Sequence, residues 1–300
     1  MTILPAYRNV WSRVISFSSL CDAVIQNREI HDILPEEIQR DYRYIKGKVL
    51  LTDFAGRDSI AACIKILNDE NIGTIIPVGD IVPSRYGDSD SYSQNWDALA
   101  QLIEEKHPHV ELKPWFIIDG QDFWKTMNER YVDQILERYG WFTPCIGCHF
   151  HFYAMRSVLV DLLGKENTIL TSGEKRLHSN GKRKANQTDA AVEGYRRFSR
   201  EHGVEHRFPI HDMDSEEDMK KLIGGKWKEG GSQMSCIHSG NDRDTDGQLK
   251  YTDEQISQMM NDYVLPMGKK YVELEIDMEN QDYRLNILDE YSEELLRGTQ

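Results

Sequence analysis

Residues 48–67, KVLLTDFAGRDSIAACIKIL, join a short apolar run, a loop with one glycine and an amphipathic segment. The pattern predicts a buried strand at residues 49–52 and a helix at residues 59–67. A helix N-terminus offers unpaired backbone N–H groups and the positive end of the helix dipole. This order of elements therefore predicts a place where a phosphate can bind, and Gly56 would let it approach the backbone closely.

The same alternation of apolar runs and amphipathic segments continues along the chain. Strand-like runs lie at residues 74–78, 114–118, 168–171 and 206–210, and helical patterns lie between them at 96–105, 123–139, 152–163 and 189–202. This alternation predicts an α/β fold with a doubly wound, mostly parallel sheet covered on both faces. Ligands of such sheets bind beyond the carboxyl ends of the strands. The loops at 53–59, 79–84, 119–120 and 172–176 are all expected at that edge.

The remaining segments flank this pattern. Residues 1–45 are expected to form a helical N-terminal extension, and residues 246–300 a helical or irregular C-terminal one. With 39% hydrophobic and 29% charged residues, the composition is typical of a soluble globular protein. No apolar stretch approaches the roughly 18–20 residues that cross a bilayer. No secretory pattern opens the chain, and five cysteines fit a reduced compartment. We therefore expect a cytoplasmic protein without a membrane partner.

The charge of the chain limits its partners. A net charge of −14 argues against a large nucleic-acid footprint, since phosphate contacts need basic side chains. Residues 174–207 depart from this balance, with nine Lys or Arg against five acidic residues. This segment is either a solvated surface or a phosphate-binding rim near the site.

Three cysteines have a spacing that suggests chemistry. Cys145 and Cys148 stand in TPCIGCHF, and Cys236 stands in QMSCIHSG, 88 positions later. A C-x-x-C pair places two soft ligands on one turn, and a distant loop can add a third. Three thiolates can hold three irons of a 4Fe-4S cluster and leave the fourth iron open. Cys21 and Cys63 lie on apolar helix faces, so we expect them to be buried.

Two other interpretations of these cysteines stay open. Structural zinc would need a fourth ligand, which could come from one of three nearby histidines: His149, His151 or His238. Alternatively, the thiols could form a redox pair, or Cys148 or Cys236 could carry sulfur as a persulfide.

The stretch VLLTDFAGRDSIAA resembles the PP-loop of the N-type ATP pyrophosphatases, in which a strand is followed by S-G-G-x-D-S. Gly56, Asp58 and Ser59 match this pattern, whereas Phe54 and Ala55 replace its first serine and glycine. The cysteine arrangement is similar to that of the tRNA 2-thiocytidine and 2-thiouridine enzymes, which use a 4Fe-4S cluster. The resemblance covers roughly residues 46–240, and the corresponding domain is expected at 46–245.

The resemblance implies a fold of the adenine nucleotide α-hydrolase type and a set of site residues. It implies that ATP and Mg²⁺ bind with Asp58 organising the metal ion, that Val78 and Gly79 lie near the adenine, and that Cys145, Cys148 and Cys236 hold the cluster. It places the ATP phosphates on Thr52, Asp53, Phe54, Ala55, Gly56, Arg57, Asp58 and Ser59, and the ribose and α-phosphate near Ser172, Gly173 and Glu174.

Two basic residues follow the strand at 168–171. Lys175 and Arg176 could stabilise charge on departing pyrophosphate, or could simply belong to a solvated loop.

Together these features predict an ATP-dependent sulfurtransferase that forms AMP and pyrophosphate and acts on a small purine nucleotide or nucleobase, as in thioguanine-type thioamide formation. Sulfide or a sulfur-donor protein would supply the sulfur, and the chain could be oligomeric. A tRNA base is the rival acceptor. A PP-loop amidotransferase or ligase, an adenylyl sulfate reductase and a non-catalytic nucleotide-binding module are the other possibilities.

Overall fold

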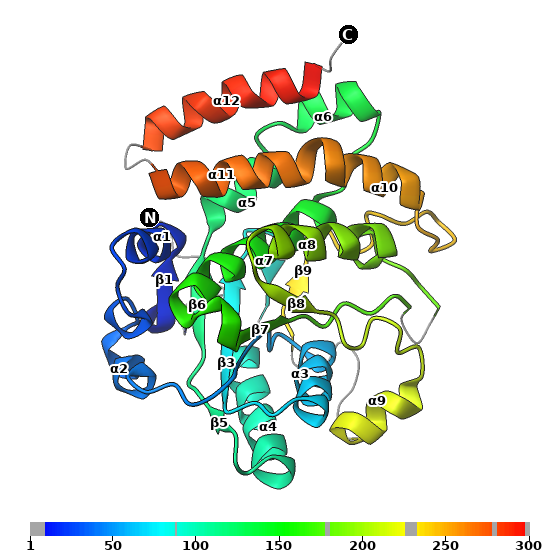
Figure 1. The fold of residues 1–300 in the computed structure, drawn as a ribbon. Helices are drawn as coiled ribbons and strands as arrows, with labels where there is room; N and C mark the ends of the chain where they lie inside the picture. Colours follow the sequence, from blue (N-terminus) through cyan, green and yellow to red (C-terminus); the bar gives the residue numbers. More distant parts are fainter. Residues whose placement is uncertain (1–9, 88, 178–180, 226–232, 278–280, 298–300) are drawn as a thin grey trace.

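A computed structural model describes residues 10–87, 89–177, 181–225, 233–277 and 281–297 of the chain. A seven-stranded sheet forms its centre, in the spatial order β1-β6-β3-β2-β7-β8 with β5 beside β3 (Figure 1). All pairings in this sheet are parallel, which confirms the predicted fold class. Its strands are β1 (Val14–Ser16), β2 (Val49–Thr52), β3 (Thr74–Ile81), β5 (Glu111–Leu112), β6 (Phe116–Asp119), β7 (Thr168–Thr171) and β8 (Glu205–Arg207).

The strand order reverses beside β2. From β2 the chain continues outward through β3 and β6 on one side, then returns to β7 and β8 on the other. The carboxyl ends of β2 and β7 therefore lie next to each other, with Thr52 opposite Thr171. In open α/β sheets the crevice at such a reversal is the usual ligand site.

Helices cover both faces of the sheet because successive strand side chains point to opposite sides. Val49 and Leu51 pack into one core cluster, and Leu50 packs into the other. The Leu51 side is covered by α1 (Phe17–Ile25), α5 (Gln121–Asn128), α7 (Pro144–Leu163) and α8 (Asp189–Glu201). The Leu50 side is covered by α3 (Arg57–Asp69), α4 (Asp90–Lys106) and α9 (Glu216–Ile223).

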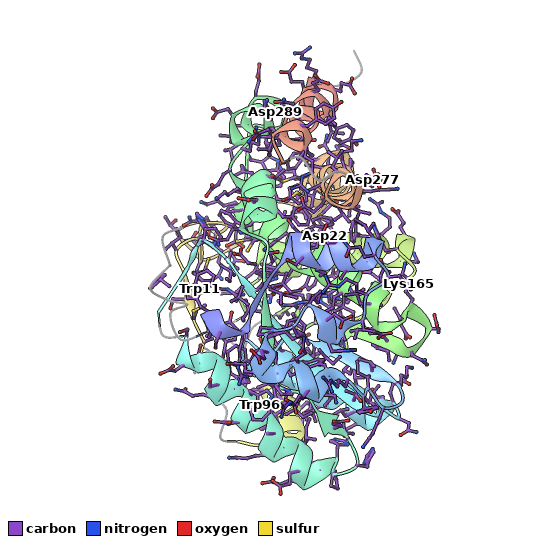
Figure 2. The ribbon with its side chains drawn as sticks, turned by 90° about the vertical axis from the view of Figure 1, so that its left-hand side faces the viewer. Trp11, Asp22, Trp96, Lys165, Asp277 and Asp289 are labelled. Carbon is purple, nitrogen blue, oxygen red and sulfur yellow. The ribbon has the colours of Figure 1, made fainter. Side chains whose placement is uncertain are left out.

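A further helical layer lies outside α7 and α8. It consists of α10 (Asp253–Met259), a π-helical turn (Met260–Val264), α11 (Leu265–Asp277), α12 (Gln281–Arg297) and α6 (Val132–Tyr139). Figure 2 shows Asp289 of α12 at one end of the molecule and Trp96 of α4 at the other. In the C-terminal extension, a non-helical segment at residues 246–252 is followed by α10, the π-helical turn, α11 and α12.

Short elements complete the chain. They are the antiparallel pair β4 (Arg85–Tyr86) and β9 (Ser235–Cys236), helix α2 (Glu36–Gln39) and 3₁₀ turns at Trp11–Arg13, Ile30–Asp32, Arg40–Tyr42, Lys165–Asn167 and Ala185–Gln187. Within the described ranges, no helix combines the length and apolarity that a membrane span requires.

Three segments differ from the sequence-based expectation. The N-terminal segment is not only helical, because its strand β1 joins the sheet beside β6. Strand β3 extends through Ile81, so part of the expected loop at 79–84 is strand. The single helix expected at 123–139 is two helices, α5 and α6. Between them Arg130 forms an ion pair with Asp289 at 2.8 Å, and the Tyr131 hydroxyl donates to the same carboxylate at 3.0 Å. These contacts hold the residues between α5 and α6 against α12.

Candidate functional site

Strand β2 leads through the loop at residues 53–56 into helix α3. Gly56 is the N-cap of α3, with extended backbone (φ −178°, ψ −170°) and no side-chain cap on the first N–H groups. Because α3 is 13 residues long and begins at the carboxyl end of β2, its N-terminus presents donors and a positive dipole at the sheet reversal. The predicted strand, loop and helix are confirmed as elements.

A pocket of about 500 Å³ opens at this helix start. Five segments contribute to its wall: the loop and first turn of α3, helix α7, the loop after β7, the turn before α8 and the segment before β9. The lining residues are Asp53, Ala55, Gly56, Arg57, Asp58, Ser59, His149, Tyr153, Gly173, Glu174, Lys184, Gln187 and Gln233. We call this cavity the β2–α3 pocket.

Gly173 brings two of these segments into contact. A Cβ atom at this position would lie 2.5 Å from the backbone nitrogen of Ser59 and 2.6 Å from the carbonyl carbon of Asp58. Both distances are far below van der Waals contact, and neither backbone atom can move without shifting α3. Glycine at 173 is therefore needed to hold the loop after β7 against the N-terminus of α3.

The residues that depart from the PP-loop pattern have structural roles. Asp53 Oδ1 accepts hydrogen bonds from the backbone nitrogens of Phe54 at 2.7 Å and Ala55 at 3.0 Å. The Phe54 ring is fully buried and packs against Tyr92 and Trp115, with ring centroids 5.4 and 5.9 Å away. Thus the loop is fixed by a carboxylate on one side and by an aromatic anchor in the core on the other.

Behind the pocket lies a buried ion pair between Asp80 of β3 and Arg156 of α7. Both residues are only 1% exposed, and Arg156 Nη2 also lies 3.9 Å from Asp53 Oδ1. Burial raises the pKa of Asp80 to about 6, although the positive charge of Arg156 opposes this rise. Arg156 thus links the β2–α3 loop to the sheet interior.

Glu174 is the most extensively bonded carboxylate of the pocket. Its Oε1 accepts from Tyr153 and, at 2.7 Å, from Nδ1 of His149, and its Oε2 accepts from Asn186 at 3.1 Å. Burial alone would raise the pKa of Glu174, but the charge of His149 and the hydrogen bonds of His149, Tyr153 and Gln187 outweigh it and lower the pKa to about 2. Glu174 is therefore ionised throughout the physiological range and connects three segments of the wall.

The two C-x-x-C thiols lie in the first turn of α7, which begins at Pro144 after the N-cap Thr143. Burial raises the pKa of Cys145 to about 11 and that of Cys148 to about 12. The charge of Cys236 contributes to the rise at both positions, so the three sulfurs lie within electrostatic reach of one another. We call these three residues the thiol site.

Cys236 reaches this region through the small β4–β9 sheet, where it pairs with Arg85. Its thiol donates to the Ser84 hydroxyl at 3.6 Å. Burial raises the pKa of Cys148, and the positive charge of Arg85 opposes that rise. Cys21 and Cys63 are fully buried in the core, as predicted.

The nearby histidines are engaged elsewhere. His149 binds Glu174, and Nδ1 of His151 binds the backbone carbonyl of Cys148 at 2.5 Å. The ring of His238 stacks on Trp124 with centroids 6.4 Å apart. Within the part of the chain that the structure describes, no group of three or more His, Cys, Asp or Glu side chains is placed to hold a metal ion. Among these residues the thiols and histidines are therefore not assembled as a ligand set, either for zinc or for an iron-sulfur cluster.

Several sequence-predicted residues face away from the pocket. Val78 and Gly79 are buried within β3, where a Cβ on residue 79 would lie 2.5 Å from Ile117. The Thr52 hydroxyl donates to the Asp53 carbonyl, and the Ser172 hydroxyl bonds Nε2 of His206 at 2.8 Å. None of these four predicted residues lines the β2–α3 pocket.

The two basic residues after Glu174 do not line the pocket either. Arg176 forms ion pairs with Asp189 at 2.9 Å and Asp212 at 2.5 Å. Lys175 is completely enclosed, and its Nζ has no hydrogen-bond partner within the described residues. Of these two residues, Arg176 is therefore paired with carboxylates, whereas Lys175 has no counterion among the described residues.

The structure adds wall residues to which sequence reasoning gave no role. Tyr153, Gln187 and Gln233 line the pocket, and His149, expected only as packing or as a zinc ligand, lines it as well. One signal was present: Cys145, His149, Tyr153 and Arg156 recur every three or four residues, which places them on one face of a helix. Gln187 and Gln233 left no comparable pattern.

The fold and this geometry define a doubly wound α/β protein with a pocket at the sheet reversal, where the N-terminus of α3 begins, and with three thiols near it. No protein-family model matches the chain. The uncharacterized protein MJ0009 of Methanocaldococcus jannaschii is 33% identical over 219 residues, which cover 73% of this chain and 78% of that protein. The chain belongs to the same family as MJ0009.

Among solved structures, NMN synthetase from Francisella tularensis aligns over 95% of this chain and 96% of its own. The sequence identity is 11% and the TM-score is 0.29. A likeness at that TM-score establishes neither a shared fold nor a shared activity.

Proposed function

We propose that the chain binds ATP in the β2–α3 pocket, adenylates a carbonyl oxygen of a small nucleobase or nucleotide and replaces that oxygen with sulfur. In the first step the carbonyl oxygen attacks the α-phosphorus of ATP, and pyrophosphate leaves. In the second step hydrosulfide adds to the activated carbon, and the carbon–oxygen bond breaks with the oxygen departing on AMP. The remaining thiol proton is lost to give the thiocarbonyl. No redox change occurs, so neither step needs a reductant.

The nucleotide half rests on the start of α3. Its uncapped N–H groups and the Ser59 hydroxyl offer donors to phosphate oxygens, and Lys184 adds a positive charge to the same wall. Asp58 also lines the pocket, where it is available to organise Mg²⁺ bound to the phosphates. A pocket of about 500 Å³ is large enough for a mononucleotide ligand.

The sulfur half rests on the thiol site. In a 4Fe-4S cluster each cysteine thiolate binds a different iron, so the ligands surround a volume instead of meeting at one point. Cys145, Cys148 and Cys236 have the right donor chemistry for such a group, which when bound would supply an open iron position for sulfide. Because burial keeps the thiols of Cys145 and Cys148 protonated at neutral pH, binding such a group would release protons.

The observation that carries this proposal is the closeness of the two halves. Lys184 lines the β2–α3 pocket, and its positive charge is a small influence that opposes the rise in the pKa of Cys145 caused by burial. His149 lines the same pocket and directly follows Cys148 in α7. A carbon activated by AMP in the pocket would therefore lie beside the thiols.

A small acceptor is favoured over tRNA because the net charge is −14. The second candidate is a nucleotide-binding protein without sulfur chemistry, or a ligase that uses ammonia. It is favoured by one finding: within the described residues, no group of three or more His, Cys, Asp or Glu side chains is placed to hold a metal ion.

The test uses protein purified without oxygen and reconstituted with iron and sulfide. It is incubated with ATP, Mg²⁺, sodium sulfide and either GMP, IMP or bulk tRNA, and pyrophosphate and thiolated product are measured. We expect pyrophosphate release that depends on a mononucleotide, and a thionucleotide detected by mass spectrometry. The variant Cys236→Ala should bind ATP normally but form no thionucleotide, whereas the core variant Cys21→Ala should retain the activity.

Each alternative has its own outcome. Thiolation of tRNA alone would make a tRNA base the acceptor. Pyrophosphate release with ammonia but not with sulfide would favour the ligase, and ATP binding without pyrophosphate release would favour the binding module. Full thionucleotide formation by Cys236→Ala would remove the thiol site from the mechanism.

A further inference from the structure

We propose that the side-chain amide of Gln233 donates a hydrogen bond to the phosphates of the bound nucleotide, and that this contact makes residues 233–236 the link through which nucleotide binding positions Cys236. The inference rests on the proposed binding of ATP in the β2–α3 pocket. It gives Gln233 two roles in the proposed reaction: it binds phosphate, and it is a positioning residue for the thiol site.

Gln233 lies over the start of α3. A Cβ atom on Gly56, the N-cap of this helix, would lie 2.9 Å from Oε1 of Gln233 and 3.9 Å from its amide carbon. The Gln233 side chain is exposed and lines the pocket. Within the described residues its amide makes no hydrogen bond, so its N–H groups and its oxygen are available to a ligand.

The chemistry of the pocket gives this amide a partner. Three side chains of the wall, Asp53, Asp58 and Glu174, carry carboxyl groups, and phosphate oxygens can only accept hydrogen bonds. Binding a phosphate here therefore requires donors that compensate for these acceptors. The N–H groups at the start of α3 and Lys184 are such donors, and the Gln233 amide lies at the same helix start.

The segment that Gln233 begins contacts the loop at residues 53–56 a second time. Met234 packs against the buried cluster that contains Phe54, Tyr92 and Trp115. Phe54 is the aromatic anchor of that loop, and Gly56 is its last residue. Two consecutive residues of one segment therefore contact the loop at its anchor and at its end. A ligand that fixes this loop also fixes the start of the segment.

The same segment continues into the thiol site. Cys236 belongs to β9 and pairs with Arg85 of β4, and the backbone nitrogen of Ile237 donates to the Ser84 carbonyl at 3.0 Å. Gln233 precedes Cys236 by three residues, which is roughly 10 Å of extended chain. A nucleotide that holds Gln233 therefore restricts where Cys236 can lie.

The first experiment isolates the phosphate contact. Titration calorimetry compares ATP and adenosine for the wild type, Gln233→Ala and Gln233→Glu. We expect Gln233→Ala to bind ATP about tenfold more weakly, because a hydrogen bond to a charged phosphate is lost. Gln233→Glu should bind ATP more weakly still, because a carboxylate of the same length cannot donate. Adenosine has no phosphate, so all three proteins should bind it equally.

A matched control is Gln101→Ala. Gln101 is an exposed glutamine of α4 that does not line the pocket, so its substitution should change neither affinity. Because Gln233 is exposed as well, Gln233→Ala should unfold at the same temperature as the wild type. A loss of ATP binding in this variant is then not a loss of folding.

The second experiment measures the link to the thiol site. Hydrogen–deuterium exchange of the Ile237 amide, which is bonded to Ser84, reports how firmly β9 is held against β4. Saturating ATP should slow this exchange in the wild type and in Gln101→Ala. In Gln233→Ala the exchange should stay at the rate of the ligand-free protein, even at an ATP concentration that saturates this variant.

Equal affinities of the wild type and Gln233→Ala for ATP would overturn the phosphate contact. The link to Cys236 is refuted if ATP slows the exchange of Ile237 in Gln233→Ala as in the wild type, or in neither protein. Each of these results leaves ATP binding by the wild type intact and so refutes this inference alone. If the wild type does not bind ATP, the proposed function fails as well.

Discussion

The β2–α3 pocket and the thiol site both lie at the N-terminus of a helix, yet they are stabilised in different ways. At the pocket, Glu174 is ionised, and both Glu174 and Asp53 are already bonded to protein donors. At the thiol site, burial raises the pKa of Cys145 and Cys148, so both are neutral at physiological pH. The pocket is therefore organised before a ligand arrives, whereas the thiol site gains its charge only when something binds it.

The largest expected effect comes from the residue that joins the pocket to the sheet. Replacing Arg156 by Met leaves Asp80 buried without its counterion, so we expect a loss of about 4 kcal/mol in the free energy of unfolding. Arg176→Met is the matched control. Its side chain is 38% exposed, and its ion pairs should contribute less than about 1 kcal/mol. Urea denaturation of both variants measures the difference, and equal losses would contradict the role given to Arg156.

A second effect follows from the low pKa of Glu174. Its pKa falls from the ordinary 4.5 to about 2 in the folded chain, so its ionisation stabilises the fold above about pH 4.5, by about 3 kcal/mol. This contribution is lost as the pH falls from 4.5 toward 2. Glu174→Gln should therefore have a lower free energy of unfolding than the wild type at pH 7. The difference between the two should become smaller as the pH is lowered.

The measurement for Glu174 is urea unfolding at a series of decreasing pH values. Glu166→Gln serves as the control, because Glu166 is an exposed glutamate on a surface turn. Its stability should track that of the wild type across the series. If the difference in the free energy of unfolding between the wild type and Glu174→Gln stays constant with pH, then packing and not charge accounts for the contribution of Glu174 to stability.

Sequence alone predicted the local part of this arrangement. The strand at 49–52, the glycine loop and the start of α3 follow from patterns within 20 residues, whereas the helix expected from residue 152 begins at Pro144 and so includes Cys145 and Cys148. The Glu174 network could not be predicted, because its donors come from α7 and from the turn before α8 and meet only in the folded chain. Likewise, the contact that Arg130, between α5 and α6, makes with Asp289 joins residues 159 positions apart and has no local sequence pattern.

A third prediction concerns the contact that closes the pocket. Gly173→Ala would push its Cβ against the Ser59 backbone, 2.5 Å away, and overpacking of this kind costs about 2 kcal/mol. It should also weaken ATP binding, because the loop after β7 moves away from α3. Gly225→Ala, where nothing lies within 4 Å, should change neither property. Thermal unfolding measures the stability, and calorimetry measures ATP binding. If Gly173→Ala changes neither property, the wall of the pocket is more easily deformed than the geometry indicates.

The smallest effect on stability is expected at the thiol site. Cys145 and Cys236 are partly exposed and form no ion pair within the described residues, so replacing either by Ser should change the free energy of unfolding by less than about 1 kcal/mol. The same substitutions should prevent iron uptake during anaerobic reconstitution, measured by counting iron and labile sulfide. Cys21→Ser is the control for iron uptake, since Cys21 is buried in the core away from these thiols. Normal iron content in Cys236→Ser would mean that two thiols suffice or that none is used. A large loss of stability would mean that the thiol site, like the pocket, is already organised before anything binds.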